Sequence, residues 1–140
     1  MENQIVVGVT GLEGQAQLTW AITESLRWSV PLLVVHCYKD RYQTEISEPS
    51  PEDVDAARTV LEFAASAADR FGVVVDTLLG DGFPGEVLVE ASEGAIHLIV
   101  GSSHRGRLSH AKHSSVSTYC VRHAHCPVTI VPVSTSRRES

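Results

Sequence analysis

The sequence is short of several features that mark whole classes of protein. It holds three cysteines in 140 residues, and only 6% of its residues are aromatic. Disulfide-stabilised secreted domains use cysteine far more densely, so Cys37, Cys120 and Cys126 indicate a reducing compartment. No apolar run approaches the roughly 18 residues of a membrane helix, and the N-terminal segment has no basic and apolar signal-peptide pattern. These absences predict a cytoplasmic protein that does not contact membranes.

Basic residues are also scarce. There are 11 Lys and Arg against 17 Asp and Glu, which gives a net charge of −6 and a pI near 5.6. A general nucleic-acid binder needs a basic surface, so we expect no nucleic-acid partner. The length predicts one domain over residues 1–140 with a flexible tail at residues 134–140, and a 43% hydrophobic content is ordinary for a globular core.

The sequence does contain five short apolar runs that predict strands. They are Ile5–Val9, Leu32–Cys37, Val73–Leu78, Ile96–Gly101 and Val128–Val133. Most are continuously apolar, which is typical of parallel strands buried on both faces. Helical patterns fill the gaps at Gln15–Ser29, Pro51–Phe71, Pro84–Glu93 and Ser114–Ala124. This alternation predicts a Rossmann-like, doubly wound α/β domain with five parallel strands and four helices.

The second helix has the clearest signals. Ser50 is placed to cap it, Pro51 suits its first position, and Gly72 offers a C-terminal stop. Its expected inward face is Val54, Ala57, Leu61, Ala64, Ala68 and Phe71. The first helix should turn Leu18, Ala21, Ile22, Ser25 and Leu26 to one side, with Trp20 and Trp28 as packing residues.

Open α/β sheets bind ligands beyond the C-terminal ends of their strands. Three loops occupy such places: Thr10–Gly14, Lys39–Ser50 and Gly101–His113. The third holds Arg105, Arg107 and Lys112 and leads into a helix at Ser114. Unpaired N–H groups and the helix dipole favour an anion there, so this loop is a candidate anion site; an ordinary solvated loop with a serine cap is the alternative.

Two other constellations favour structural roles. Cys120, His123, His125 and Cys126 fall within seven residues and could suggest a zinc site, but buried thiols and capping imidazoles near a helix end explain them better. His36 and His97 fall within strand patterns and should be hydrogen-bonded core or edge residues. No nucleophile elbow and no P-loop motif is present, so the sequence predicts no metal site, no catalytic residue and no enzyme.

Several segments together resemble a known family. They are Ile5–Val9, Leu33–His36, Gly82–Leu88, Val100–Ser103 and Val121–Val128. Over about residues 4–133 the chain is similar to the universal stress protein family. The resemblance implies the strand order 3-2-1-4-5, a dimer, and kinship with a branch that binds ATP through G-x2-G-x9-G-[ST] after the fourth strand.

The chain departs from that motif. Gly101 holds its first glycine and Ser115 its hydroxyl, but His104 and Ser114 replace the other two glycines. Thr10 stands where the family commonly has an aspartate, and Cys37 occupies a position that lines the adenine pocket. The candidate nucleotide- or anion-binding residues are Gly8, Val9, Thr10, Cys37, Gly101, His104, Arg105, Ser114, Ser115 and Val116. Because several contacts are altered, we expect weak or absent ATP binding and no firmly implied cofactor.

The resemblance implies a non-catalytic stress-response protein acting as a homodimer. Its last strand, through Val128, Ile130 and Val131, is the expected dimer edge. Its expected partners are a second copy and an anionic small molecule or nucleotide. Two alternatives stay open: a nucleotide-binding regulatory module with slow hydrolysis, and an interaction scaffold without a ligand.

Overall fold

The computed structural model describes residues 3–11, 15–38, 50–102 and 116–132. In chain order its elements are β1 (Ile5–Gly8), α1 (Gln15–Trp28), β2 (Leu32–Cys37), α2 (Pro51–Asp69), β3 (Val75–Gly80), α3 (Pro84–Ala91), β4 (His97–Gly101), α4 (Val116–His123) and β5 (Val128–Val131). The predicted alternation of strands and helices is confirmed. The predicted tail at residues 134–140 and the loop at residues 39–49 lie outside the described residues.

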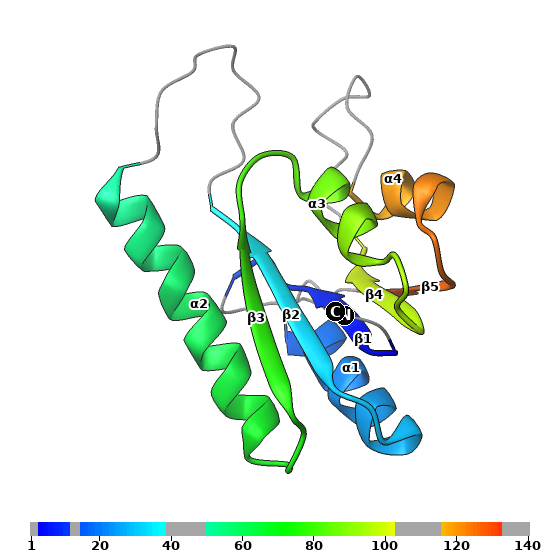
Figure 1. The fold of residues 1–140 in the computed structure, drawn as a ribbon. Coiled ribbons are helices and arrows are strands. Elements are labelled where there is room, and N and C mark those ends of the chain that lie inside the picture. Colours follow the sequence, from blue (N-terminus) through cyan, green and yellow to red (C-terminus); the bar gives the residue numbers. More distant parts are fainter. Residues whose placement is uncertain (1–2, 12–14, 39–49, 103–115, 133–140) are drawn as a thin grey trace, which may run out of the picture.

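The five strands form one parallel sheet in the order β3-β2-β1-β4-β5 (Figure 1). The doubly wound α/β fold is therefore confirmed, strand order included. At the centre, Val7 of β1 is in register with Val34 of β2 on one side and Ile99 of β4 on the other. The chain runs outward from β1 through β2 to β3, then crosses back to β4 and β5. The direction of winding reverses between β1 and β4, and this reversal positions the candidate site.

Two layers of helices bury the two faces of the sheet. On one face α1 and α2 enclose a cluster whose buried members include Ile5, Val7, Leu18, Val34, Leu61 and Ile99. On the other face α3 and α4 enclose Val6, Val35, Leu88, Leu98, Val100 and Cys120. Successive strand residues alternate between the two clusters because strand side chains have a period of two. The prediction of strands buried on both faces is confirmed for β1, β2 and β4.

The helix α2 begins as the sequence predicts. The Ser50 hydroxyl accepts a hydrogen bond from the backbone N–H of Asp53 at 3.1 Å, and Pro51 occupies the first turn. Gly72, with φ at 83°, closes the C-terminal end. The prediction for Phe71 is wrong, since its side chain is 62% exposed. It lies after the last helical residue, so the helical period no longer sets its direction.

The third strand differs from its prediction in position and burial. It runs from Val75 to Gly80 rather than from Val73 to Leu78, because Val73 still packs into the core after the turn at Gly72. It is also one of the two edge strands, and its middle residues Asp76, Thr77 and Leu78 are exposed. An apolar run therefore did not guarantee burial on both faces here.

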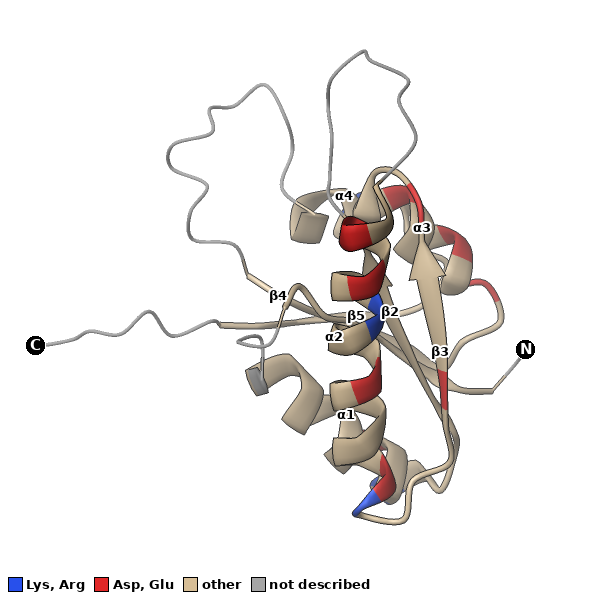
Figure 2. Ribbon diagram, turned by 90° about the vertical axis from the view of Figure 1, so that its left-hand side faces the viewer, with Lys and Arg blue, Asp and Glu red and all other residues tan. Residues whose placement is uncertain are grey.

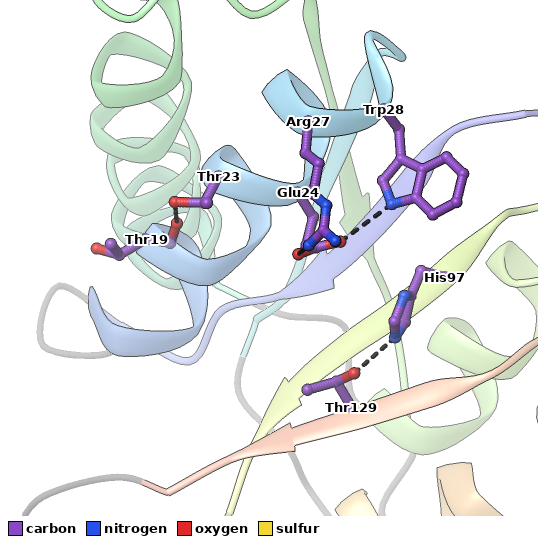
Figure 3. A network of polar contacts seen from close by, with 7 residues as sticks. All are labelled: Thr19, Thr23, Glu24, Arg27, Trp28, His97 and Thr129. Carbon is purple, nitrogen blue, oxygen red and sulfur yellow. Dashed lines mark hydrogen bonds and ion pairs between the residues drawn. The ribbon is translucent and has the colours of Figure 1, made fainter.

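The helix α1 departs most from its predicted pattern. Leu18, Ala21, Ile22 and Ser25 are buried as expected, but Leu26 is exposed. The prediction that Trp20 and Trp28 are packing residues is also wrong, because these side chains are 49% and 54% exposed. The indole N–H of Trp28 instead donates to Glu24 Oε1 at 3.1 Å, one turn back on the helix (Figure 3).

Acidic residues dominate the outer surface of α2 and α3. Figure 2 shows Asp and Glu along both helices, and they include Glu52, Asp53, Asp55, Glu62 and Asp69 on α2. Such a surface repels polyanions. Within the described ranges, no helix combines the length and apolarity needed to span a membrane.

Candidate functional site

The described part of the candidate site lies at the C-terminal edge of the sheet. Gly8 ends β1, Cys37 ends β2 and Gly101 ends β4. Because the strands are parallel, these ends share one edge, and Val116 begins α4 after the β4 connection. The order reverses between β1 and β4, which is where open α/β sheets bind ligands. The predicted grouping of Gly8, Val9, Thr10, Cys37 and Gly101 at one edge is therefore supported.

The predicted anion-binding loop is not part of this description. His104, Arg105, Ser114 and Ser115 lie outside the described residues, as do Arg107 and Lys112. The anion site that the sequence predicts before α4 remains a prediction.

Hydrogen bonds hold the end of β1 firmly in place. Although β1 ends at Gly8, the Val9 N–H still donates to the Val35 carbonyl at 2.9 Å. The Val9 carbonyl accepts from His36 Nδ1 at 2.8 Å. Val9 is buried, whereas the next residue, Thr10, is exposed. The chain is thus hydrogen-bonded to β2 as far as Val9, and Thr10 is the first solvent-exposed residue after β1.

The histidine predictions are confirmed. His36 is satisfied by the Val9 carbonyl, and because a carbonyl can only accept, its Nδ1 carries the proton. His97 Nε2 lies 2.6 Å from Thr129 Oγ1, which links β4 to β5 (Figure 3). Both imidazoles thus have structural hydrogen-bond partners.

Cys37 packs against the neighbouring strand. It is half-buried and in register with Gly80, and a Cβ placed on Gly80 would lie 2.8 Å from Cys37 Sγ. The same Cβ would lie 2.9 Å from Val87 of α3. The thiol is therefore directed to the α3 side of the sheet, and glycine at position 80 makes room for it.

Tyr38 and Asp81 form a polar pair at the same edge that the sequence did not reveal. Each directly follows one of the paired residues Cys37 and Gly80, so the register places them side by side. Burial raises the pKa of Tyr38, and so do the negative charge of Asp81 and its side-chain hydrogen bond. The signal available in the sequence was their position, one residue past the ends of adjacent strands.

A second residue missed by the sequence reasoning is Gln17, in the first turn of α1. Its side chain is 2% exposed, and its Nε2 donates to the Gly8 carbonyl at 3.1 Å. A Cβ on Gly101 would lie 2.9 Å from Gln17 Oε1. The carboxamide therefore spans the ends of β1 and β4. Helical spacing gave a signal, since Gln17 lies four residues before Ala21 on the buried side.

The cysteines near α4 are not activated. Burial, and secondarily the neighbouring Cys126, raises the pKa of Cys120 to about 11, and burial raises the pKa of Cys126. Thiols held protonated at neutral pH are poor nucleophiles and poor metal ligands. Within the described segments no three His, Cys, Asp or Glu side chains are grouped to hold a metal ion. His123 instead stacks on Tyr119, with ring centroids 4.4 Å apart.

Comparison with known proteins places this architecture in a family. The model of the universal stress protein family matches residues 1–132. The chain belongs to the universal stress protein family. A universal stress protein of Mycobacterium tuberculosis is 35% identical to it over 136 residues, which cover 91% of this chain and 47% of the relative. Another, from Mycobacterium bovis, is 34% identical over 142 residues, 93% of this chain and 48% of the relative. The chain thus spans about half the length of these curated relatives.

Solved universal stress proteins share the fold. One from Archaeoglobus fulgidus is 25% identical with a TM-score of 0.71, and the match covers 94% of each chain. One from the same organism, in complex with dAMP, is 26% identical with a TM-score of 0.69 and covers 92% of this chain and 97% of its own. A family protein from Arabidopsis thaliana with AMP bound has a TM-score of 0.67 at 23% identity, over 99% of this chain and 96% of its own.

Proposed function

We propose that this universal stress protein is a non-catalytic, cytoplasmic regulatory protein that binds an adenine nucleoside monophosphate. The nucleotide would lie at the C-terminal edge of the sheet, beyond the ends of the neighbouring strands β1 and β4. The observation that carries the proposal is the gathering of Gly8, Thr10 and Gly101 at the point where the strand order reverses. The Archaeoglobus fulgidus relative in complex with dAMP, at 26% identity over 92% of this chain, supports this ligand class.

A triphosphate should bind weakly or not at all. Thr10 offers one hydroxyl where the resemblance leads one to expect a carboxylate, which weakens the contact with the sugar of AMP and ATP alike. His104 and Ser114 replace glycines of the family's phosphate motif. Each badly replaced polar contact costs about 1–3 kcal/mol, so two or three such losses lower affinity by orders of magnitude.

Calorimetric titration tests this proposal. The unmodified protein is titrated with AMP and with ATP and magnesium, and the double variant Thr10→Asp/His104→Gly is titrated alongside it. We expect saturable AMP binding by the unmodified protein, and ATP binding that becomes strong only in the double variant. Micromolar ATP binding by the unmodified protein contradicts the altered-motif argument. Failure of both proteins to bind either nucleotide favours a scaffold without a ligand.

We also propose that two copies pair through β5. This strand is outermost in the sheet, and the side chain of Ile130 is 41% exposed on it. An exposed apolar edge strand invites pairing with another strand across a two-fold axis.

Light scattering after size exclusion tests the dimer. Ile130→Lys should give a monomer, because it places charge in the paired edge. Val74→Lys is the matched control, since Val74 is 74% exposed beside the opposite edge strand β3. A dimer that persists in Ile130→Lys, or is lost equally in Val74→Lys, argues against pairing through β5.

A further inference from the structure

The side chain of Gln17 is buried with one of its two polar atoms lacking a partner among the described residues. It is 2% exposed, and its Nε2 donates to the Gly8 carbonyl. Its Oε1 has no hydrogen-bond partner among the residues that the structure describes. A buried acceptor without a donor carries an uncompensated desolvation penalty, so this oxygen calls for an explanation.

The orientation of the carboxamide follows from its one partner. The Gly8 carbonyl can only accept, so the NH₂ group of Gln17 must face it. Exchanging the amide nitrogen and oxygen would place Oε1 against the Gly8 carbonyl oxygen, and neither atom can donate a hydrogen bond. The whole carboxamide lies against Gly101, where a Cβ would come within 2.9 Å of Oε1 and 3.0 Å of Nε2.

The location of this oxygen is the ligand-binding end of the fold. Gly8 and Gly101 end the neighbouring strands β1 and β4, between which the strand order reverses. Gln17 itself belongs to the first turn of α1, whose backbone N–H groups have no partners within the helix. The buried acceptor and its close contact with Gly101 thus lie at the place where the strand order reverses.

We propose that Gln17 is a ligand-binding residue whose Oε1 accepts a hydrogen bond from the nucleoside part of the bound nucleotide. This inference rests on the proposed nucleotide function. The donor is a ribose hydroxyl or the adenine amino group, since both present a hydrogen to an acceptor. A fully ionised phosphate group has only acceptors, so it cannot donate a hydrogen bond to Oε1. The residue therefore sets which part of the nucleotide lies at the C-terminal ends of β1 and β4.

The experiment compares Gln17→Met with the unmodified protein. Methionine keeps nearly the same length and volume but offers no oxygen acceptor. Calorimetry measures affinity for AMP, for 2′,3′-dideoxy-AMP and for the monophosphate of purine riboside, which lacks the amino group. Ser25→Ala is the matched control, because Ser25 is on the same helix, is 1% exposed and also has a hydroxyl oxygen without a partner among described residues. It lies two turns further along α1, about 12 Å from Gln17 along the helix axis.

We expect Gln17→Met to weaken AMP binding about tenfold, the effect of one lost polar contact, and Ser25→Ala to leave it unchanged. The unmodified protein should bind one analogue more weakly than AMP, which identifies the donor, and Gln17→Met should no longer make that distinction. If Gln17→Met binds AMP as tightly as the unmodified protein, or discriminates the analogues equally well, the inference is overturned while the proposed function stands. If the unmodified protein binds no AMP, the proposed function falls and this assignment with it.

A spectroscopic arm covers the case in which Gln17→Met does not fold. In the unmodified protein, the side-chain amide resonances of Gln17 should shift on saturation with AMP. Resonances that do not move at saturation overturn the inference.

Discussion

The helices α1 and α2 cover the same face of the sheet but differ in whether they bury polar residues. On α2, Ala57, Leu61, Ala64 and Ala68 are buried, and none of its buried residues is polar. On α1, Gln17 and Ser25 are buried while Trp20 and Trp28 are half exposed. Because α1 buries polar groups where α2 buries apolar ones alone, its sequence serves something besides core packing.

The difference follows from what each helix covers. The helix α2 packs on β2 and β3, away from the reversal of strand order. The helix α1 packs on β1 and β4, and its first turn reaches the edge where those strands end. Departures from the apolar pattern thus concentrate on the helix that touches the candidate site. Two stability predictions and one surface prediction test this contrast.

The largest effect should come from the conventional helix. Leu61→Ala removes a buried side chain from the core beneath α2 and should lower the free energy of unfolding by about 2–5 kcal/mol. Phe63→Ala, on the same helix but at a position that is 46% exposed, should cost clearly less. Urea denaturation measures both. Equal losses at the two positions would mean that α2 is not the one-sided helix that its burial pattern indicates.

The next effect tests the contact between α1 and the site. Gly101→Ala places a Cβ 2.9 Å from Gln17 Oε1 and should lower the free energy of unfolding by about 1–3 kcal/mol through overpacking. In a Gln17→Ala background the space is free, so the same change should cost much less. The coupling energy from the four proteins measures the contact directly. Additive losses would show that glycine is needed at 101 for a reason other than Gln17.

Most of the fold could be predicted from the sequence because its signals were redundant. The cap at Ser50, the proline at 51 and the glycine at 72 each marked the bounds of α2 independently of its apolar period. The predicted start of β3 was two residues too early, since Val73 is apolar and buried but precedes the ladder that starts at Val75. The apolar character of a residue does not show whether it packs into the core from a turn or from a strand.

The candidate site could be predicted only in part. Strand ends located Gly8, Cys37 and Gly101, because parallel strands bring their ends to one edge whatever the side chains are. Gln17 and the pair Tyr38 and Asp81 were missed, since their roles depend on which atoms meet across elements. The spacing of residues in the sequence does not show which side chains meet. For Tyr38 and Asp81 the register of β2 with β3 does show it.

The smallest effect should be at the exposed side of α1. Trp28→Phe removes the indole N–H that donates to Glu24 but keeps an aromatic ring at a position that is 54% exposed. A hydrogen bond in contact with water adds little, so the free energy of unfolding should change by less than about 0.5 kcal/mol. Trp20→Phe is the matched control two turns earlier, at a position that is 49% exposed and on the same helix. In each single variant the remaining tryptophan should be readily quenched by acrylamide, as expected of an exposed indole. A large loss of stability, or a tryptophan protected from quenching, would mean that this side of α1 is covered in solution and that the contrast with α2 is smaller than the burial pattern indicates.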